Sequence, residues 1–260
     1  MQSSCLNALT GVLIGLCACL SSASAQSLIA GIPNASVAHK GHLEMTHESQ
    51  LNWWDGDVKW TSFNFWCYGI NNRTELTVTF NNLAVPGSGN LTAGVGFKHL
   101  VPLLPARPRH ELKLTVGTNA LVSLQGRGLG FWSYGHLSGR LPVLRTRLTG
   151  GLSYGTEQAF GFRRVGLTDP TAPRPSGLSG AEPAALRPLR PLSFIGGVEQ
   201  PLVGPVSFIA DWFSGSHDLA ALITALQLDT HKVTYIAGYK RANNANSGVN
   251  ALIVEVMYRF

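Results

Sequence analysis

The sequence predicts an all-β chain that closes into an antiparallel transmembrane barrel of about twelve strands, with one long Pro/Arg-rich outer loop. Three observations support this fold class. Charged residues make up only 13% of the 260 residues, well below the ~25% of an ordinary soluble domain. No apolar run approaches the roughly 18–20 residues of a membrane-spanning helix. Instead, short segments of alternating apolar and polar residues follow one another, as in strands that face lipid on one side and a lumen on the other.

The first 25 residues are typical of an export signal. Gly11–Leu20 ("GVLIGLCACL") is a short apolar core, and Ala23–Ala25 offers a small-residue cleavage site. The segment ahead of the core departs from the pattern because it has no Lys or Arg. "LCAC" (Leu16–Cys19) loosely resembles a lipoprotein cleavage box, so lipidation of Cys19 is an alternative. Removal of residues 1–25 leaves Cys67 as the one cysteine, which excludes an intramolecular disulfide and a cysteine-based metal site.

Alternating segments separated by Gly, Asn, Pro and Ser turns follow a polar lead-in, 26–41. In 110–124, for example, Leu112 and Leu114 share one parity while Glu111 and Lys113 share the other. Glycines within the segments would weaken a flat soluble sheet, whereas small residues fit the crowded inside of a barrel. A secreted, loop-rich β-sandwich is the alternative. The predicted strands are 42–49, 56–70, 74–81, 91–100, 110–124, 129–141, 144–155, 192–199, 205–213, 218–229, 232–240 and 249–260.

Connection lengths alternate between the two ends of the predicted barrel. Counting back from Phe260, the longer connections "RANNANSG", "FSGSHD" and 156–191 fall on one side. The short turns "DTHK", "QPLVGP", "GRLPV", "PLLPARPRH" and "NNR" fall on the other. Membrane barrels have short periplasmic turns and long outer loops, so an even strand count places both termini in the periplasm. The Pro/Arg-rich 156–191 is then an outer loop that constricts the lumen, contacts surface lipid or is solvated.

The C-terminal strand carries the clearest class signal. In "ALIVEVMYRF" the apolar residues Leu252, Val254, Val256, Tyr258 and Phe260 alternate with polar or small ones. This pattern resembles the assembly signal of bacterial outer-membrane β-barrel proteins, a porin-like class. The resemblance covers architecture and points to no specific family. It implies the outer membrane of a bacterium or a bacterially derived organelle, contact with its lipids, and recognition by the barrel-insertion machinery through Tyr258 and Phe260. Nothing in the sequence argues for an oligomer.

The polar residues that alternate with the apolar ones along each predicted strand are the side chains expected to line the lumen. Arg140, Arg145 and Arg147 adjoin across a tight turn, and arginines in a narrow pore favour anions. The sequence therefore predicts a channel for passive diffusion of small hydrophilic solutes with a mild anion preference. The alternative is a structural barrel whose charges pair across strands and plug the lumen. The candidate pore-lining residues are Arg140, Arg145, Arg147, Lys113, Lys98, Arg259, Glu111, Glu255 and Asp211, with Glu75 and Glu199 on the same parity.

A further alternative is an outer-membrane lipid acyl hydrolase. "YGHLSGR" puts His136 and Ser138 on one face of a strand, and it resembles the His-x-Ser element of outer-membrane phospholipase A and lipid A deacylases. Those families continue with Asn where Gly139 stands here, and Leu137 and Leu141 occupy the expected lipid face. We therefore assign no catalytic residue. The polar residues of 211–218 are explained by a turn, so neither a metal ion nor a cofactor is predicted. The net charge is +6, but the chain has no lysine-rich run, so nucleic acid is not an expected partner.

Overall fold

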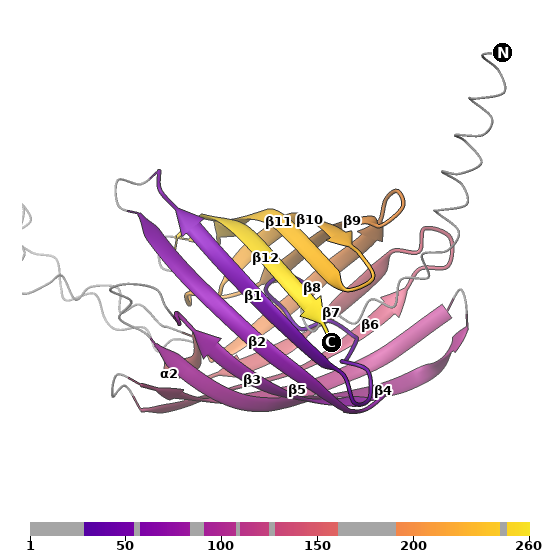
Figure 1. Cartoon of the computed structure of the whole chain (residues 1–260), viewed down its shortest axis with the longest axis horizontal. Coiled ribbons are helices and arrows are strands. Elements are labelled where there is room, and N and C mark those ends of the chain that lie inside the picture. The colour runs from indigo at the N-terminus through magenta and orange to yellow at the C-terminus, as the bar shows by residue number, and fades with distance from the viewer. Residues whose placement is uncertain are drawn as a thin grey trace, which may run out of the picture.

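The computed structural model describes residues 29–54, 58–83, 91–107, 110–124, 128–160, 191–244 and 249–260; side chains 105–107, 110 and 157 are outside the description. The predicted export signal (1–25) and most of the long loop (161–190) lie outside these residues. Twelve strands form a closed antiparallel barrel, in which each strand pairs with its neighbours in sequence and β12 pairs with β1 (Figure 1). The predicted closed antiparallel barrel of about twelve strands is confirmed. Among the described residues, no helix is long and apolar enough to cross a membrane.

Every predicted strand is present, and most strand ends lie within three residues of the predicted ones. The fourth strand continues to Arg107, so most of "PLLPARPRH" is strand and its prediction as a turn was wrong; register shifts at Pro102/Leu104 and Leu104/Arg107 accommodate the prolines as irregularities. The seventh begins at Arg147, after a turn in which Arg145 has a positive φ of 57°. The tenth begins at Ala221. The elements are β1 (Leu43–Asn52), β2 (Lys59–Asn71), β3 (Thr74–Asn81), β4 (Thr92–Arg107), β5 (His110–Ser123), β6 (Leu129–Arg140), β7 (Arg147–Gly155), α2 (Glu157–Phe160), β8 (Leu192–Pro201), β9 (Val206–Phe213), β10 (Ala221–Asp229), β11 (Val233–Ala242) and β12 (Ala251–Arg259).

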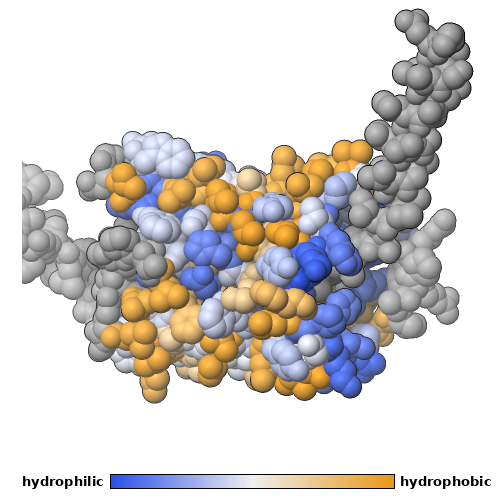
Figure 2. Space-filling view, viewed as in Figure 1, coloured by the Kyte–Doolittle hydropathy of each residue, from blue (hydrophilic) through white to orange (hydrophobic). Residues whose placement is uncertain are grey.

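The two faces of the barrel wall differ in polarity as the alternation predicts. In β12, Ile253 and Glu255 are buried inside while Leu252 and Val254 are exposed outside. Large apolar side chains are exposed on every strand except β1, and Figure 2 shows apolar side chains spread over the visible face. An outer surface of this kind is stable in contact with hydrocarbon rather than water.

The inner wall is itself divided into two halves. The inward positions of β1–β7, which we call the polar wall, include the buried residues Glu48, Glu75, Lys98 and Thr115. On β8–β12, each of the five consecutive strands contributes one buried isoleucine, and we call these five side chains the isoleucine wall; buried polar residues such as Lys240 and Glu255 lie on the same strands. The five are Ile195, Ile209, Ile223, Ile236 and Ile253.

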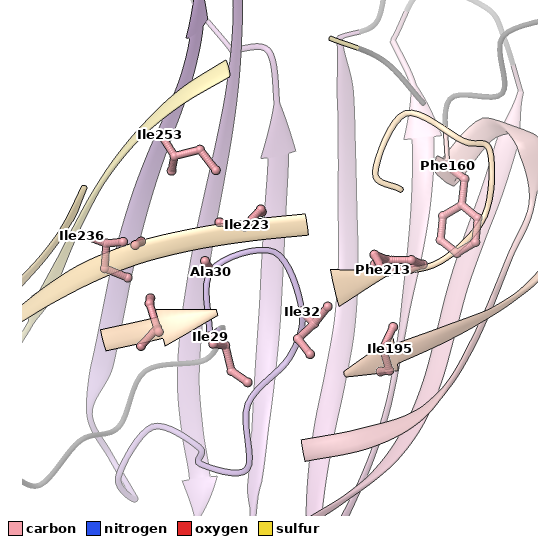
Figure 3. Packing of buried hydrophobic residues seen from close by; sticks show 11 residues of the cluster. Ile29, Ala30, Ile32, Phe160, Ile195, Phe213, Ile223, Ile236 and Ile253 are labelled. Atoms are coloured by element: carbon pink, nitrogen blue, oxygen red, sulfur yellow. The ribbon is translucent and has the colours of Figure 1, made fainter. Parts of the chain in front are cut away.

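Of residues 29–41, predicted only as a polar lead-in, 29–38 lie inside the barrel (Figure 3), and 39–41 are exposed. Ile29, Ala30, Ile32 and Ala38 are each at most 1% exposed. A hydrogen bond from the Ile29 N–H to the Ile32 carbonyl (2.8 Å) closes a turn at the deep end of this stretch. At its other end, Lys40 forms an isolated parallel bridge with Gly69 of β2. We call residues 29–41 the lumen segment.

Candidate lumen site

The deep part of the lumen segment fits closely against the isoleucine wall. A Cβ atom at Gly197 of β8 would lie 2.5 Å from Cδ1 of Ile29 and 3.2 Å from Cδ1 of Ile32. A Cβ at Gly31 would lie 2.8 Å from Cδ1 of Ile223. A side chain at Gly197 or Gly31 would therefore have to displace the tips of Ile29, Ile32 or Ile223, so glycine lets the segment lie directly against the barrel wall.

One carboxylate holds the turn of the lumen segment. Oδ2 of Asp211, an inward residue of β9, accepts hydrogen bonds from the Ala30 N–H (2.8 Å) and the Gly31 N–H (2.7 Å). Asp211 is only 3% exposed. A buried carboxylate is stable only when hydrogen-bonded or paired, and here the segment's backbone supplies the donors.

The shallow part of the segment contacts the polar wall. Glu75 and Lys98 form a buried ion pair with an Nζ–Oε1 distance of 3.1 Å. The other Glu75 oxygen accepts a hydrogen bond from the Ala38 N–H (2.7 Å). Lys98 Nζ donates to Oδ1 of Asn34 (3.4 Å), and Lys113 Nζ donates to the Ala35 carbonyl (3.5 Å). The segment therefore bridges both halves of the inner wall.

A cavity of about 180 Å³ lies at the end of the barrel where β1 begins and β12 ends. We call it the vestibule. Cross-strand pairing places Glu111, Arg140, Arg147 and Glu199 in one row at this end. Arg147 Nη2 lies 2.9 Å from Oε2 of Glu111, which also pairs with Lys113. The vestibule is lined by Arg140, Arg145, Arg147, Glu199, Gln227 and Asp229, among others.

Neither a protein-family model nor a characterised protein matches the sequence. Several solved structures are similar to the chain. Among them are the KdgM porin (12% identity, 84% of this chain and 99% of that one, TM-score 0.48), the outer membrane protein Omp33 of Acinetobacter baumannii (11%, 86% and 100%, 0.45) and the COG4313 outer membrane channel of Pseudomonas putida F1 (11%, 87% and 98%, 0.43). Likeness at this level carries no information on function, and the class follows from the barrel itself.

Closure, an even number of strands, an apolar outside and a charged inside occur together in this chain. It has the architecture of an outer-membrane β-barrel. A closed barrel leaves no unpaired strand edge in the hydrocarbon, and inward charges avoid the cost of about 2–4 kcal/mol for a basic residue facing lipid at the midplane. The inner wall is therefore where functional residues of this barrel are expected.

Most predicted pore-lining residues lie inward, but the lumen segment separates them. Lys98, Asp211 and Glu255 are almost fully buried deep in the barrel, whereas Arg140, Arg145 and Arg147 line the vestibule. Glu111, Lys113 and Arg259 are also at the vestibule end. Arg259 lies 3.1 Å from Oδ1 of Asp229. Among the described residues, Arg140 and Arg145 form no ion pair, and Arg145 is exposed in the β6–β7 turn.

Sequence reasoning missed several inward charges. Glu44 and Glu48 of β1 are buried, although their alternation with Leu43, Met45 and His47 was visible in the sequence. Lys240 of β11 is also buried, and its Nζ donates to Oε1 of Gln50 at 2.9 Å. The additional carboxylates make the inner wall less basic than the predicted set suggests.

The two histidine–serine arrangements are buried inside the barrel. Ser138 hydrogen-bonds to Thr149 (2.9 Å) rather than to His136, whose ring nitrogens have no hydrogen-bond partner among the described residues. The outer-membrane acyl hydrolases that this element resembles need a catalytic face toward lipid, and neither side chain has one here. A second pair, Ser193 Oγ and His217 Nε2, lies 3.0 Å apart.

His217, in the loop between β9 and β10, is sealed by aromatic rings. Its imidazole stacks on Phe160 (centroids 4.4 Å apart) and meets Phe213 edge-on (4.8 Å). Burial lowers its pKa from 6.5 to about 4, so it stays neutral near pH 7. Because Ser193 and His217 are each 1% exposed, the pair holds the loop against β8 and has no access to a substrate.

In the described part of the chain, no group of three or more His, Cys, Asp or Glu side chains is placed to hold a metal ion.

Proposed function

We propose that the chain is an outer-membrane channel for small hydrophilic solutes, closed in this conformation by the lumen segment. The observation that carries the proposal is a charged, cavity-containing inner wall inside an apolar exterior. Ionic and polar groups facing a lumen stabilise water and polar solutes there. No residue has to do chemistry in this role.

The same proposal includes how the chain reaches the membrane. Residues 1–25 act as a cleaved export signal, and both termini face the periplasm, with the vestibule opening on that side. The C-terminal strand is read by the barrel-insertion machinery. The exposed rings of Tyr258 and Phe260 support this role, because their centroids lie 4.6 Å apart and form one outward aromatic pair. The Phe260 N–H also donates to the Leu43 carbonyl (2.9 Å), where the barrel closes.

In this proposal, the charged residues of the vestibule give the channel a mild preference for anions. Arg140 and Arg145 line it with no ion pair among the described residues, so their charge is available to a passing anion. The nearby carboxylates Glu199 and Asp229 keep the preference small. An anion entering from the periplasmic side meets this field before it meets the lumen segment.

The second candidate is a structural barrel that never opens. It is favoured by the hydrogen bonds of the lumen segment to Asp211 and Glu75 and by its close fit at Gly197. The two candidates differ in whether the segment leaves the lumen under working conditions.

Single-channel conductance in a planar bilayer distinguishes them. The refolded chain 26–260 should give rare, small steps, and a variant lacking residues 29–38 should give steady steps at least about threefold larger. Gly197→Val should also open the channel, because its side chain would collide with Ile29. Gly196→Val is the matched control, since a Cβ at Gly196 would approach only the Thr149 carbonyl, at 3.8 Å. Silence from the deletion variant, with folding shown by heat-modifiable gel mobility, would establish the structural barrel.

Ion selectivity is tested in the open variant. Arg140→Glu combined with Arg145→Glu should move the reversal potential in a KCl gradient toward cation preference. Arg241→Glu reverses one charge, half of that change, at an exposed position at the far end of β11, and it should leave the reversal potential unchanged. An equal shift in both variants would remove the vestibule from the proposal.

A further inference from the structure

The isoleucine wall is an unusual lining for a lumen that conducts only hydrophilic solutes. Its five isoleucines come from adjacent strands and form one cluster with Ile29, Ala30 and Ile32 of the lumen segment (Figure 3). If the segment leaves, this apolar surface faces water, which is unfavourable in proportion to its area. An occupant with apolar groups is therefore preferred at this place.

Asp211 adds a polar requirement in the middle of the apolar surface. It pairs in register with Gly197 of β8 and with Ile223 of β10, so the carboxylate is flanked by the same groups that contact Ile29, Ile32 and Gly31. Departure of the segment removes the two N–H donors to its Oδ2. A buried carboxylate without donors is costly, so the occupant must also supply N–H groups.

The lumen segment shows which chemistry satisfies both requirements. Ile29-Ala30-Gly31-Ile32 places two aliphatic side chains on the wall and two backbone N–H groups on one carboxylate. A second cavity, of about 60 Å³, reaches Ala30 and Gly31 from the side of Glu48, Phe63 and Trp132. The turn of the segment is thus adjacent to open space rather than enclosed on all sides.

We propose that the site occupied by residues 29–32 binds short aliphatic peptides, which compete with the lumen segment for the isoleucine wall and Asp211. This inference rests on the proposed channel and names its solute class. A peptide is small and water-soluble through its backbone, yet its aliphatic side chains match the wall. Binding of such a peptide replaces the contacts of residues 29–32 with the isoleucine wall and Asp211, so their displacement does not expose the apolar surface to water.

Isothermal titration calorimetry in detergent tests the site independently of conductance. The probe is the peptide acetyl-Ile-Ala-Gly-Ile-amide, titrated into the refolded variant lacking residues 29–38. We expect one peptide to bind per barrel, and we expect at least tenfold weaker binding to the chain 26–260, where the segment competes. The same peptide N-methylated at Ala and Gly lacks the two donors and should bind at least tenfold more weakly to the deletion variant.

Protein variants locate the binding on the inner wall. In the deletion background, Asp211→Ala and Ile223→Ala should each weaken the peptide by about tenfold or more. Leu226→Ala is the matched control, because Leu226 lies on β10 like Ile223 but faces outward and is 54% exposed. This variant should leave the affinity for the peptide unchanged. If the deletion prevents folding, the double variant Ile29→Asp, Ile32→Asp retains the full chain length and expels the segment by burying charge on the apolar wall.

The outcomes separate this inference from the channel itself. A folded, conducting deletion variant that does not bind the peptide overturns the inference and leaves the channel standing. Equal binding of the N-methylated peptide also overturns it, because Asp211 would then have no part. Peptide binding to a barrel that never conducts would support the site and reject the channel.

Discussion

The polar wall and the isoleucine wall hold the same lumen segment by different forces. On the polar wall, the ion pair of Glu75 with Lys98 and hydrogen bonds to the segment's backbone and Asn34 fix residues 34–38. On the isoleucine wall, contact of aliphatic side chains and one carboxylate fix residues 29–32. Charge interactions in a buried place are sensitive to the loss of one partner, whereas apolar contacts are sensitive to shape and volume. The two attachments should therefore fail under different substitutions.

The largest effect is expected from Glu75→Ala on the polar wall. This change leaves Lys98 buried without its carboxylate and the Ala38 N–H without its acceptor. Removing one partner of a buried ion pair costs about 3–5 kcal/mol. Urea unfolding in detergent, followed by tryptophan fluorescence, should show a loss of that size. The double variant Glu75→Ala, Lys98→Met should recover most of the stability; a loss below about 1 kcal/mol for the single variant would mean that water already solvates the pair.

A smaller effect is expected from truncation on the isoleucine wall. Ile253→Ala removes a fully buried side chain from the cluster around Ile29 and Ile32, which should cost about 2–4 kcal/mol in the same assay. Val254→Ala on the outer face is the neighbouring control and should cost less than about 1 kcal/mol. Deleting residues 29–38 should reduce the cost of Ile253→Ala, because Ile29 and Ile32 belong to the same buried cluster. Equal costs at both positions would show that the wall is not packed.

The strands were predictable from the sequence because their signal is periodic. Alternation over eight or more residues defines a barrel strand and its inward face, so the inward positions of Lys98, Asp211 and Glu255 followed from parity. The strand residues of "PLLPARPRH" were hidden because proline usually ends a strand, and only pairing with β5 shows that a register shift accommodates it.

The lumen segment left no such signal. "IAGIPNASVA" has neither a strand nor a helix period, and its burial depends on partners far along the chain. Asp211 lies 181 residues from Ala30, and the glycine that accepts Ile29 is on β8. These contacts arise only after the barrel has closed. Apolar and small residues show that a segment can be buried, but not where.

The effect that is smallest near neutral pH is a pH dependence from His217, where the loop above the isoleucine wall packs on Phe160 and Phe213. Burial lowers the folded-state pKa of His217 to about 4, from 6.5 in the unfolded chain. Between these values the unfolded chain binds the extra proton, so stability falls as pH decreases from about 6.5 to about 4 and is unaffected by this group above 6.5. One such group contributes at most about 1.4 kcal/mol per pH unit.

Unfolding free energies of the chain and of His217→Gln, measured between pH 4 and pH 8, should therefore differ in slope only below pH 6.5, with the variant less sensitive to acid. Ser193→Ala, which removes the hydroxyl partner of the ring and leaves its aromatic cover in place, should keep most of the slope, because burial is the main cause of the lowered pKa. A slope that disappears with Ser193→Ala would assign the effect to the hydrogen bond, and an unchanged slope in His217→Gln would show that another titrating group causes it.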